Sequence, residues 1–293
     1  GTVLRAFTSR RIAALAPEIM ALSHTLIDAL PKGPFDLLPY FAAKLPVIII
    51  ARLLGVPETM APDLLRWSNA MVGMYMANRT REVEDRATAA TLAFVDFLRG
   101  YVTARRNDPR DDLITHLISA EEDGNRLSPD ELITTCILLL NAGHEATVHT
   151  IGNGVKTLLE TGTRPDNCET TVEEILRFDP ALHMFTRWAY EDVTVMGQAF
   201  KRGDQVALLL GAANRDPDAY DRPNLFDPNR AAKPHISFGA GLHFCVGAPL
   251  ARLELQIALP ILFDRLQNLR LAAPAEYANV YHFHGLKSLT VSA

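Results

Sequence analysis

A glycine-punctuated run that ends in a cysteine and leads into a helix constrains the fold more than any other feature. Residues 238–247 read Phe-Gly-Ala-Gly-Leu-His-Phe-Cys-Val-Gly. A helix is predicted directly after this run, because Leu250, Leu253 and Ile257 recur at helical spacing. Pro249 falls in the first turn of that helix, where a missing N–H costs little. The run therefore predicts a loop that presents Cys245 at the start of a helix.

The position of Cys245 predicts a reactive or metal-binding sulfur. A thiolate at a helix start faces unpaired backbone N–H groups and the positive end of the helix dipole, and both lower its pKa. Gly239, Gly241 and Gly247 allow the backbone to take positive φ and to approach a flat group closely. These features are typical of an axial thiolate ligand of haem iron. The alternative is a small buried cysteine beside a turn, which is common for free cysteines.

The run resembles the signature of the cytochrome P-450 family, which is Phe, two residues, Gly, three residues, Cys, one residue and Gly. Here Phe238, Gly241, Cys245 and Gly247 stand at that spacing. His243 matches the histidine that bacterial members often use on a haem propionate. The resemblance implies that the chain binds haem b and that Cys245 ligates its iron.

Charged residues upstream extend the resemblance. Glu174 and Arg177 lie three apart, so they share one helix face, and alone they would be read as a solvated surface pair. Together with the segment at residues 226–230 they match the family's structural triad, carried here by Glu174, Arg177 and Arg230. Arg187, in Thr-Arg-Trp-Ala, matches the family arginine that binds a haem propionate, and the alternative is an ordinary strand arginine.

A long central helix is predicted over residues 128–159. It opens with a capping box in which Ser128 and Glu131 flank Pro129 at the first helical position. The apolar residues that follow predict burial, and polar residues interrupt them too often for a membrane span. The apolar residues are Leu132, Ile133, Ile137, Leu138, Leu139 and Leu140.

The polar interruption, at residues 141–150, resembles the family's oxygen-activation motif. The resemblance implies that Ala142 and Gly143 open a groove over the haem and that Glu145 supplies protons. Ala146 occupies the usual alcohol position, and Thr147, one residue later, points about 100° away. The hydroxyl that usually assists proton delivery is therefore absent at position 146, and a water, Thr147 or a substrate hydroxyl would have to replace it. A zinc-hydrolase reading fails on spacing, because the two histidines of this segment are five residues apart instead of four.

Composition fits one globular domain over residues 1–293. The chain is 48% hydrophobic and 22% charged, and its net charge of −5 suggests no nucleic-acid partner. Its three cysteines are few and unclustered, which favours a reducing cytoplasm. The expected class is mainly α with small β-sheets, the cytochrome P-450 fold lacking roughly its N-terminal quarter. Helices are predicted at residues 9–30, 42–54, 61–77 and 83–107, and a further short helix is predicted to end near residue 120. Short strands are predicted at residues 193–195, near 200, at 206–210 and at 286–291.

The resemblance implies a haem-thiolate monooxygenase that inserts one oxygen atom of O2 into a small apolar substrate. Electrons would come from a ferredoxin or flavodoxin that docks near the cysteine loop, where Arg252, Arg10 and Arg11 are candidate contacts. No membrane partner is expected. Candidate substrate-pocket residues are Leu139, Ala142, Leu182, His183, Met184, Phe185, His282, Phe283 and His284.

Two alternatives remain at this point. One is a truncated, non-catalytic haem-binding or haem-free remnant. The other is a peroxide-driven peroxygenase, which the retained Glu145 disfavours, because that subtype tends to replace this acid.

Overall fold

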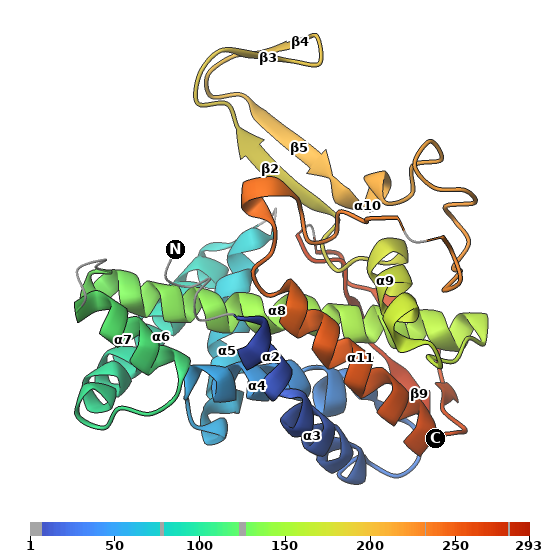
Figure 1. Cartoon of the computed structure of the whole chain (residues 1–293), viewed down its shortest axis with the longest axis horizontal. Coiled ribbons are helices and arrows are strands. Elements are labelled where there is room, and N and C mark those ends of the chain that lie inside the picture. Colours follow the sequence, from blue (N-terminus) through green and yellow to red (C-terminus); the bar gives the residue numbers. More distant parts are fainter. Residues whose placement is uncertain (1–7, 77–78, 123–126, 232, 281) are drawn as a thin grey trace.

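A computed structural model describes residues 8–76, 79–122, 127–231, 233–280 and 282–293. The fold is mainly helical with small sheets, which confirms the predicted class (Figure 1). The α-helices in these ranges are α2 (Ser9–Ala14), α3 (Ala16–Asp28), α4 (Lys44–Leu54), α5 (Ala61–Val72), α6 (Arg81–Asn107), α7 (Leu113–Glu122), α8 (Pro129–Thr161), α9 (Cys168–Phe178), α10 (Leu210–Ala213) and α11 (Ala248–Arg265). Short 3-10 or π turns are η1 (Leu38–Ala42), η2 (Glu58–Met60), η3 (Gly73–Tyr75) and η4 (Gly241–His243).

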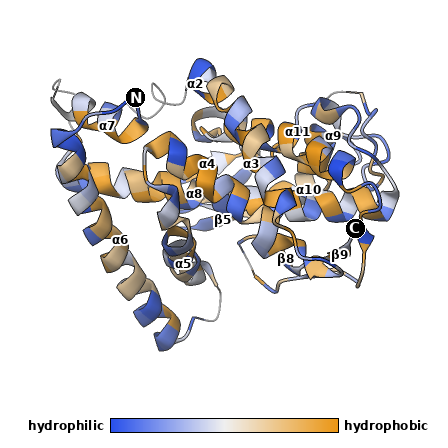
Figure 2. Cartoon of the chain, turned by 90° about the horizontal axis from the view of Figure 1, so that it is seen from below, coloured by the Kyte–Doolittle hydropathy of each residue, from blue (hydrophilic) through white to orange (hydrophobic). Residues whose placement is uncertain are grey.

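The helix α8 crosses the middle of the molecule and contacts α4, α6, α9 and α11 (Figure 1). It begins where the sequence predicts, because the Ser128 side chain accepts from the Glu131 N–H while the Glu131 carboxylate accepts from the Ser128 N–H. It ends at Gly162, whose φ of 66° is left-handed. Hydrophobic residues gather on the helices that meet around α8, whereas the outer end of α6 is hydrophilic (Figure 2). The helix therefore organises the core as well as the site.

Four small sheets complete the described fold. The strands are β1 (Phe35–Asp36), β2 (Met184–Trp188), β3 (Val193–Val195), β4 (Gln198–Phe200), β5 (Gln205–Leu209), β6 (Arg270–Leu271), β7 (Glu276–Tyr277), β8 (Leu286–Ser288) and β9 (Thr290–Ser292). One sheet has the order β1-β9-β6, and the antiparallel pairs β2-β5, β3-β4 and β7-β8 form the others. In the first sheet Phe35 pairs with Val291 and Asp36 with Thr290. This sheet joins the early helices to the C-terminal segment.

Helix boundaries differ from the predictions at a few points. The helix predicted over residues 9–30 is broken into α2 and α3, because Pro17 starts a new helix in its first turn. The helix predicted over 61–77 ends at Val72, and residue 77 lies outside the described residues. None of the helices in the described ranges is both long and apolar enough to cross a bilayer.

Candidate haem-thiolate site

The cysteine loop is closed by its own backbone. The Cys245 N–H donates to the Phe238 carbonyl over 2.9 Å, and the Gly239 N–H donates to the Ile236 carbonyl over 2.8 Å. Gly239 has a φ of +72°, and a Cβ there would lie 3.2 Å from the His243 carbonyl oxygen. Glycine is therefore required at this position by both conformation and space.

The sulfur of Cys245 lies just before α11 and its side chain is exposed. Desolvation by the surrounding protein raises the pKa of Cys245, and it outweighs the N–H groups of Gly247 and Ala248 and the charge of Arg252, which lower it. The net pKa is therefore raised, and the lowering predicted from the helix start is wrong. The predicted positive φ at Gly247 is wrong, because its φ is −81°, an ordinary value. A Cβ added at Gly247 would lie 3.8 Å from the Cys245 sulfur, which is an ordinary van der Waals contact.

The other two cysteines are more buried than Cys245, although Cys168 is itself the first residue of α9. Burial raises the pKa of Cys136 to about 12 and that of Cys168 to about 11. Of the three thiols, only Cys245 has an exposed sulfur at a helix start.

Glu174, Arg177 and Arg230 meet in one buried network. Two guanidinium nitrogens of Arg177 donate to the two Glu174 oxygens over 2.7 Å each, and Arg230 Nε donates to the same carboxylate over 3.4 Å. The Arg177 side chain is 3% exposed and the Glu174 side chain 5%. Both arginines also donate to the Leu225 carbonyl, so the network fixes the chain that leads to the cysteine loop.

A second ion cluster ties the loop to both flanking helices. Arg252 of α11 donates to Glu173 of α9 over 2.6 and 2.9 Å, and His235 Nε2 lies 3.1 Å from the same carboxylate. Burial opposes ionisation of Glu173, but its partners outweigh burial and lower its pKa to about 2. Sequence analysis missed Glu173 and His235, although Glu173 directly precedes the triad glutamate.

The three arginines predicted to meet a redox partner differ in availability. Arg252 is engaged by Glu173 and lies 4.6 Å from the Phe238 ring centroid. Arg11 pairs with Asp111 over 2.8 Å. Arg10 is exposed on α2, which contacts α11.

One face of α8 lies open, and its residues are not all those predicted. Leu138 is 64% exposed and Ala142 is exposed, whereas Leu139 is 7% exposed and belongs to the core. The assignment of Leu139 to a pocket is therefore corrected to Leu138. Gly143 does not open a groove either, since a Cβ there would lie 2.7 Å from Ile50 of α4. Its glycine is explained by close helix packing.

Glu145 is buried at the edge of this face. Its Oε1 accepts from the Ser68 hydroxyl of α5 over 3.0 Å and lies 3.4 Å from His144 Nε2. Burial raises the pKa of Glu145, but His144 and Ser68 outweigh it and the net pKa is lowered. Thr147 is buried with 5% exposure, away from the open face. Glu145 is thus an ionised carboxylate whose position is fixed by Ser68 and His144.

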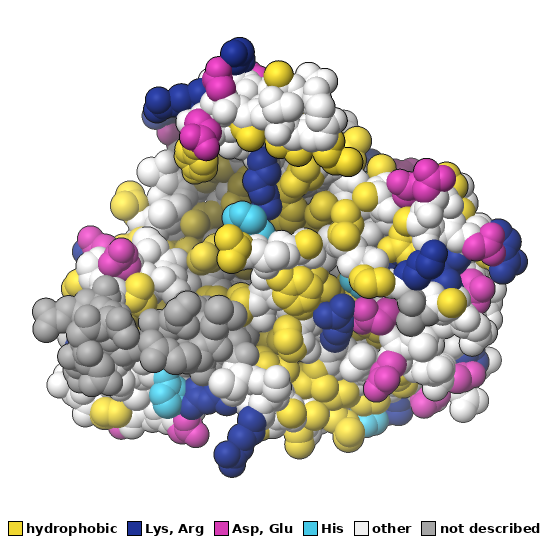
Figure 3. Space-filling view, turned by 45° about the horizontal axis from the view of Figure 1, so that its top comes forward, with side chains coloured by type: hydrophobic (Ala, Val, Ile, Leu, Met, Phe, Trp, Pro, Cys, Tyr) yellow, Lys and Arg dark blue, Asp and Glu magenta, His cyan; other side chains and the backbone are white. Residues whose placement is uncertain are grey.

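Aromatic rings from four segments form a wall beside the open face. Tyr75 of η3 stacks on His282 at 4.6 Å between ring centroids, and His282 meets Phe185 of β2 edge-on at 5.7 Å. Phe283 bridges to Leu182 and lies 5.5 Å from the ring of His149. The surface below the β3-β4 hairpin is hollowed and lined mainly by hydrophobic side chains (Figure 3).

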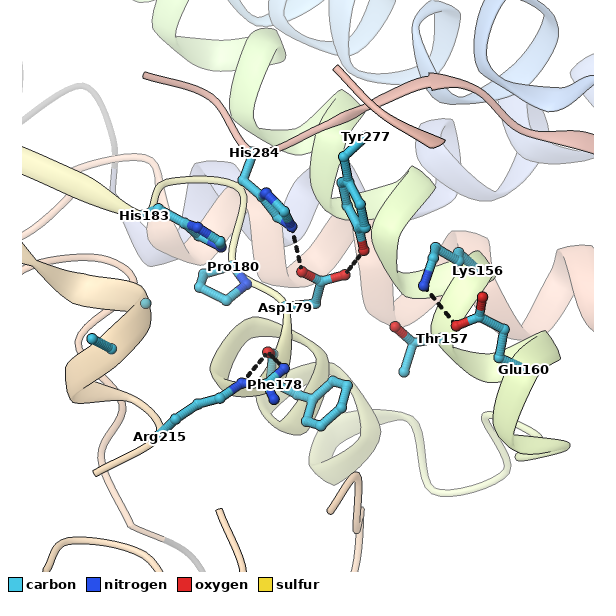
Figure 4. Close-up of a pocket in the computed structure, with 12 residues that line it drawn as sticks. Lys156, Thr157, Glu160, Phe178, Asp179, Pro180, His183, Arg215, Tyr277 and His284 are labelled. Atoms are coloured by element: carbon cyan, nitrogen blue, oxygen red, sulfur yellow. Dashed lines mark hydrogen bonds and ion pairs between the residues drawn. The ribbon is translucent and has the colours of Figure 1, made fainter. Parts of the chain in front are cut away.

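His183 does not join this wall. It lines a separate cavity of about 480 Å³, where its ring stacks on His284 at 3.9 Å between centroids and 18° between planes (Figure 4). His284 Nε2 lies 3.1 Å from Asp179, whose carboxylate also accepts from the Tyr277 hydroxyl. The assignment of His183 and His284 to the substrate pocket is corrected by these contacts. Met184, next in the chain, begins β2 opposite Leu209.

Imidazole and carboxylate atoms in that cavity lie within 4.8 Å of one another. Ring nitrogens bind a metal in the plane of the ring. The two stacked rings lie in nearly parallel planes, so their lone pairs do not converge on one ion. Burial instead lowers the pKa of His183 to about 4, which leaves its ring neutral at pH 7.

The donor set around the cysteine loop fits a haem. Cys245 offers an exposed sulfur, and the hollow offers an apolar surface for a flat macrocycle. Arg187 lies in β2 with one nitrogen on the Thr186 carbonyl at 2.9 Å, and no carboxylate in the described ranges pairs with it. His243 is exposed at the end of η4. The Arg187 guanidinium suits a propionate carboxylate, and the His243 ring can donate a hydrogen bond to one.

Comparison with known proteins agrees with this geometry. The cytochrome P-450 family profile matches residues 168–276. The polyketide biosynthesis cytochrome P-450 PksS of Bacillus subtilis is 40% identical, with 99% of this chain and 73% of that protein covered. The vitamin D(3) 25-hydroxylase of Pseudonocardia autotrophica is 40% identical, with coverages of 92% and 67%.

A solved structure shares the fold at nearly full coverage of the chain. The crystal structure of P-450BioI with an acyl carrier protein superposes with a TM-score of 0.92 at 35% identity, covering 99% of this chain and 78% of that one. Fold, cysteine loop and relatives agree: the chain belongs to the cytochrome P-450 family of monooxygenases, whose cofactor is haem b.

Proposed function

We propose that this chain inserts one oxygen atom of O2 into a small, largely apolar organic substrate bound between the open face of α8 and the aromatic wall. The observation that supports this most is the exposed sulfur of Cys245 at the start of α11, on a loop fixed by buried ion networks. Haem iron with a thiolate ligand supplies the activation of dioxygen when it is bound.

Each residue of the site then has a definite task. Cys245 is the thiolate ligand, supported by the N–H groups that face its sulfur. Arg187 holds a propionate by charge, and His243 donates a hydrogen bond to a propionate. Phe238, Gly239 and Gly247 shape the loop, and Glu174 with its two arginines holds the segment that precedes it.

The substrate side is defined by uncharged groups. Leu138, Ala142, Phe185 and Phe283 offer apolar surface, with Leu182 bridged to Phe283. Burial lowers the pKa of His282, so its ring is neutral at pH 7 and does not attract a carboxylate by charge. Among relatives, one name specifies polyketide biosynthesis and another vitamin D(3). We therefore expect an uncharged substrate of mainly hydrocarbon surface.

Electrons are proposed to come from a ferredoxin or flavodoxin. Arg10, exposed on a helix packed against α11, is the candidate contact, because small redox proteins of this kind are acidic. Reversal of its charge in Arg10→Glu should raise the KM for the partner protein and leave the haem spectrum unchanged. An unchanged KM would remove Arg10 from the docking surface.

The absorption spectrum of the reduced, CO-bound protein tests the central proposal. It separates thiolate-ligated haem, haem with another ligand, and protein without haem. Product formation with electrons from a ferredoxin and its reductase, compared with added peroxide, then tests the oxygen source. Product formed only with peroxide would contradict the monooxygenase assignment.

A further inference from the structure

His149 lies on the open face of α8, although the oxygen-activation resemblance does not include it. Seven residues separate it from Ala142, and at about 100° per residue this returns the helix to within about 20° of the same direction. It also follows Glu145 by four residues, so the two side chains are neighbours on the helix surface. His149 is half-buried, unlike the buried Thr147.

The imidazole of His149 packs closely against Gly285 and Phe283. A Cβ at Gly285 would overlap its ring, with Nδ1 as the nearest atom, so the absence of a side chain at 285 makes the space that the ring fills. Phe283 lies against it at 5.5 Å between ring centroids. This packing holds the ring and leaves Nε2 as the nitrogen that faces away from Gly285.

Nearby charges set the behaviour of this ring. Burial lowers the pKa of His149, and His284 and His144 lower it further, while the Glu145 carboxylate raises it. The net pKa is lowered, so the ring is neutral at pH 7 and able to accept a proton. Glu145 is the carboxylate that faces it, and in turn it interacts with His149, His144 and Ser68.

We propose that His149 transfers protons between Glu145 and the hollow, in the role left vacant by Ala146. The inference rests on the proposed monooxygenase function and adds a residue to it. The two groups share no direct hydrogen bond, so a proton taken up by the Glu145 carboxylate passes through a bridging water to Nε2 of His149, which becomes an imidazolium. The same nitrogen then releases the proton into the hollow, so both groups return to their starting states.

Histidine resonances provide a test that needs no turnover. We would titrate the C–H resonances of His149 in the haem-loaded, reduced and CO-bound protein, with assignment by His149→Gln. Because the Glu145 carboxylate raises the pKa of His149, Glu145→Gln should lower that pKa measurably. An identical titration of His149 in both proteins would overturn the coupling, even if the variants bind haem normally.

Turnover provides the second test. His149→Gln keeps a polar side chain but cannot carry a proton as imidazolium, so product formed per NAD(P)H should fall about tenfold or more and released peroxide should rise. The acidic limb of the rate-against-pH profile should change as well. His116→Gln, on α7, is the matched control and should couple like the wild type.

The outcomes separate the two proposals. A missing thiolate spectrum in the wild type would defeat the proposed function itself. A normal spectrum together with unchanged coupling in His149→Gln would overturn the role of His149 alone.

Discussion

The cysteine side and the open face of α8 are built in opposite ways. Around Cys245, ion pairs hold the backbone: the buried Glu174 binds two arginines, and the half-buried Glu173 binds Arg252 and lies beside His235. The open face presents Leu138 and Ala142 to solvent and has Glu145 only at its edge. One side is fixed by directional contacts, and the other offers apolar surface whose contacts depend on shape.

This difference indicates a division of work. Ion pairs and backbone hydrogen bonds fix positions within tenths of an ångström, which an iron ligand requires. Apolar contacts are non-directional, so the residues that line the open face can change with little effect on the loop. We expect substitutions on the cysteine side to be all-or-none and substitutions on the open face to be graded.

The largest effect is expected at Cys245. Cys245→Ser should abolish the thiolate-type spectrum of the reduced, CO-bound protein, because a serine hydroxyl stays protonated at neutral pH and does not replace a thiolate ligand. Cys136→Ser and Cys168→Ser are the controls and should keep the spectrum, since burial keeps both thiols protonated. Survival of the spectrum in Cys245→Ser, with its loss in either control, would reverse the assignment.

The next largest effect is expected in the triad. Arg177→Ala leaves the Glu174 carboxylate buried without its bidentate partner, which should cost about 3–5 kcal/mol in the free energy of unfolding. Denaturant unfolding and haem content measure the result. Arg66→Ala is the control, because its pair with Asp63 is exposed and is worth under about 1 kcal/mol. A stable, haem-loaded Arg177→Ala protein with normal turnover would show that the network is dispensable.

A graded effect is expected at the edge of the open face. Glu145→Gln should slow turnover more than tenfold, about 1.4 kcal/mol in the barrier, because the carboxylate that takes up and passes on the proton is lost. Thr147→Ala should do much less, since Thr147 is buried away from the face. Ala146→Thr should leave product per NAD(P)H equal or higher. If Thr147→Ala uncouples the enzyme as badly as Glu145→Gln, the helix register assigned here is incorrect.

The smallest effect is expected at Glu254, a buried ionisable residue on the cysteine side that has no ion-pair partner among the described residues, unlike Glu174. Glu254 of α11 is fully buried, neither of its oxygens has a hydrogen-bond partner among the described residues, and burial raises its pKa well above the usual range. Its folded form holds a proton that the unfolded chain releases, so stability should fall as pH rises above about 4.5.

Glu254→Gln removes this penalty and should stabilise the protein at pH 8, with little change at pH 4. Denaturant unfolding at the two pH values measures the difference. Equal effects at both values would mean that Glu254 is ionised in the fold.

Local signals in the sequence predicted much of this structure. The capping box placed the start of α8 because its two side chains satisfy N–H groups within three residues. The Glu-x-x-Arg spacing placed Glu174 and Arg177 on one face because α-helical geometry is fixed. The glycine spacing before Cys245 located the loop in the same way.

Features set by distant contacts could not be predicted. Two adjacent leucines, Leu138 and Leu139, are equivalent in sequence, and only the packing of neighbouring helices decides which is buried. The need for glycine at 143 arises from Ile50, far earlier in the chain. Arg252 is engaged by Glu173, 79 residues away, for which no local pattern exists.

The pairing of β1 with β9 has a consequence in time. Asp36 accepts from the Leu289 N–H, and Phe35 pairs with Val291, about 250 residues later. At a synthesis rate of about 5–20 residues per second, roughly 10–50 s pass between the appearance of the two strands. During that interval β1 has no strand to pair with, because β9 has not yet been synthesised. The sheet therefore closes after nearly all the described helices have been made, and a chaperone that binds β1 during synthesis would act in this interval.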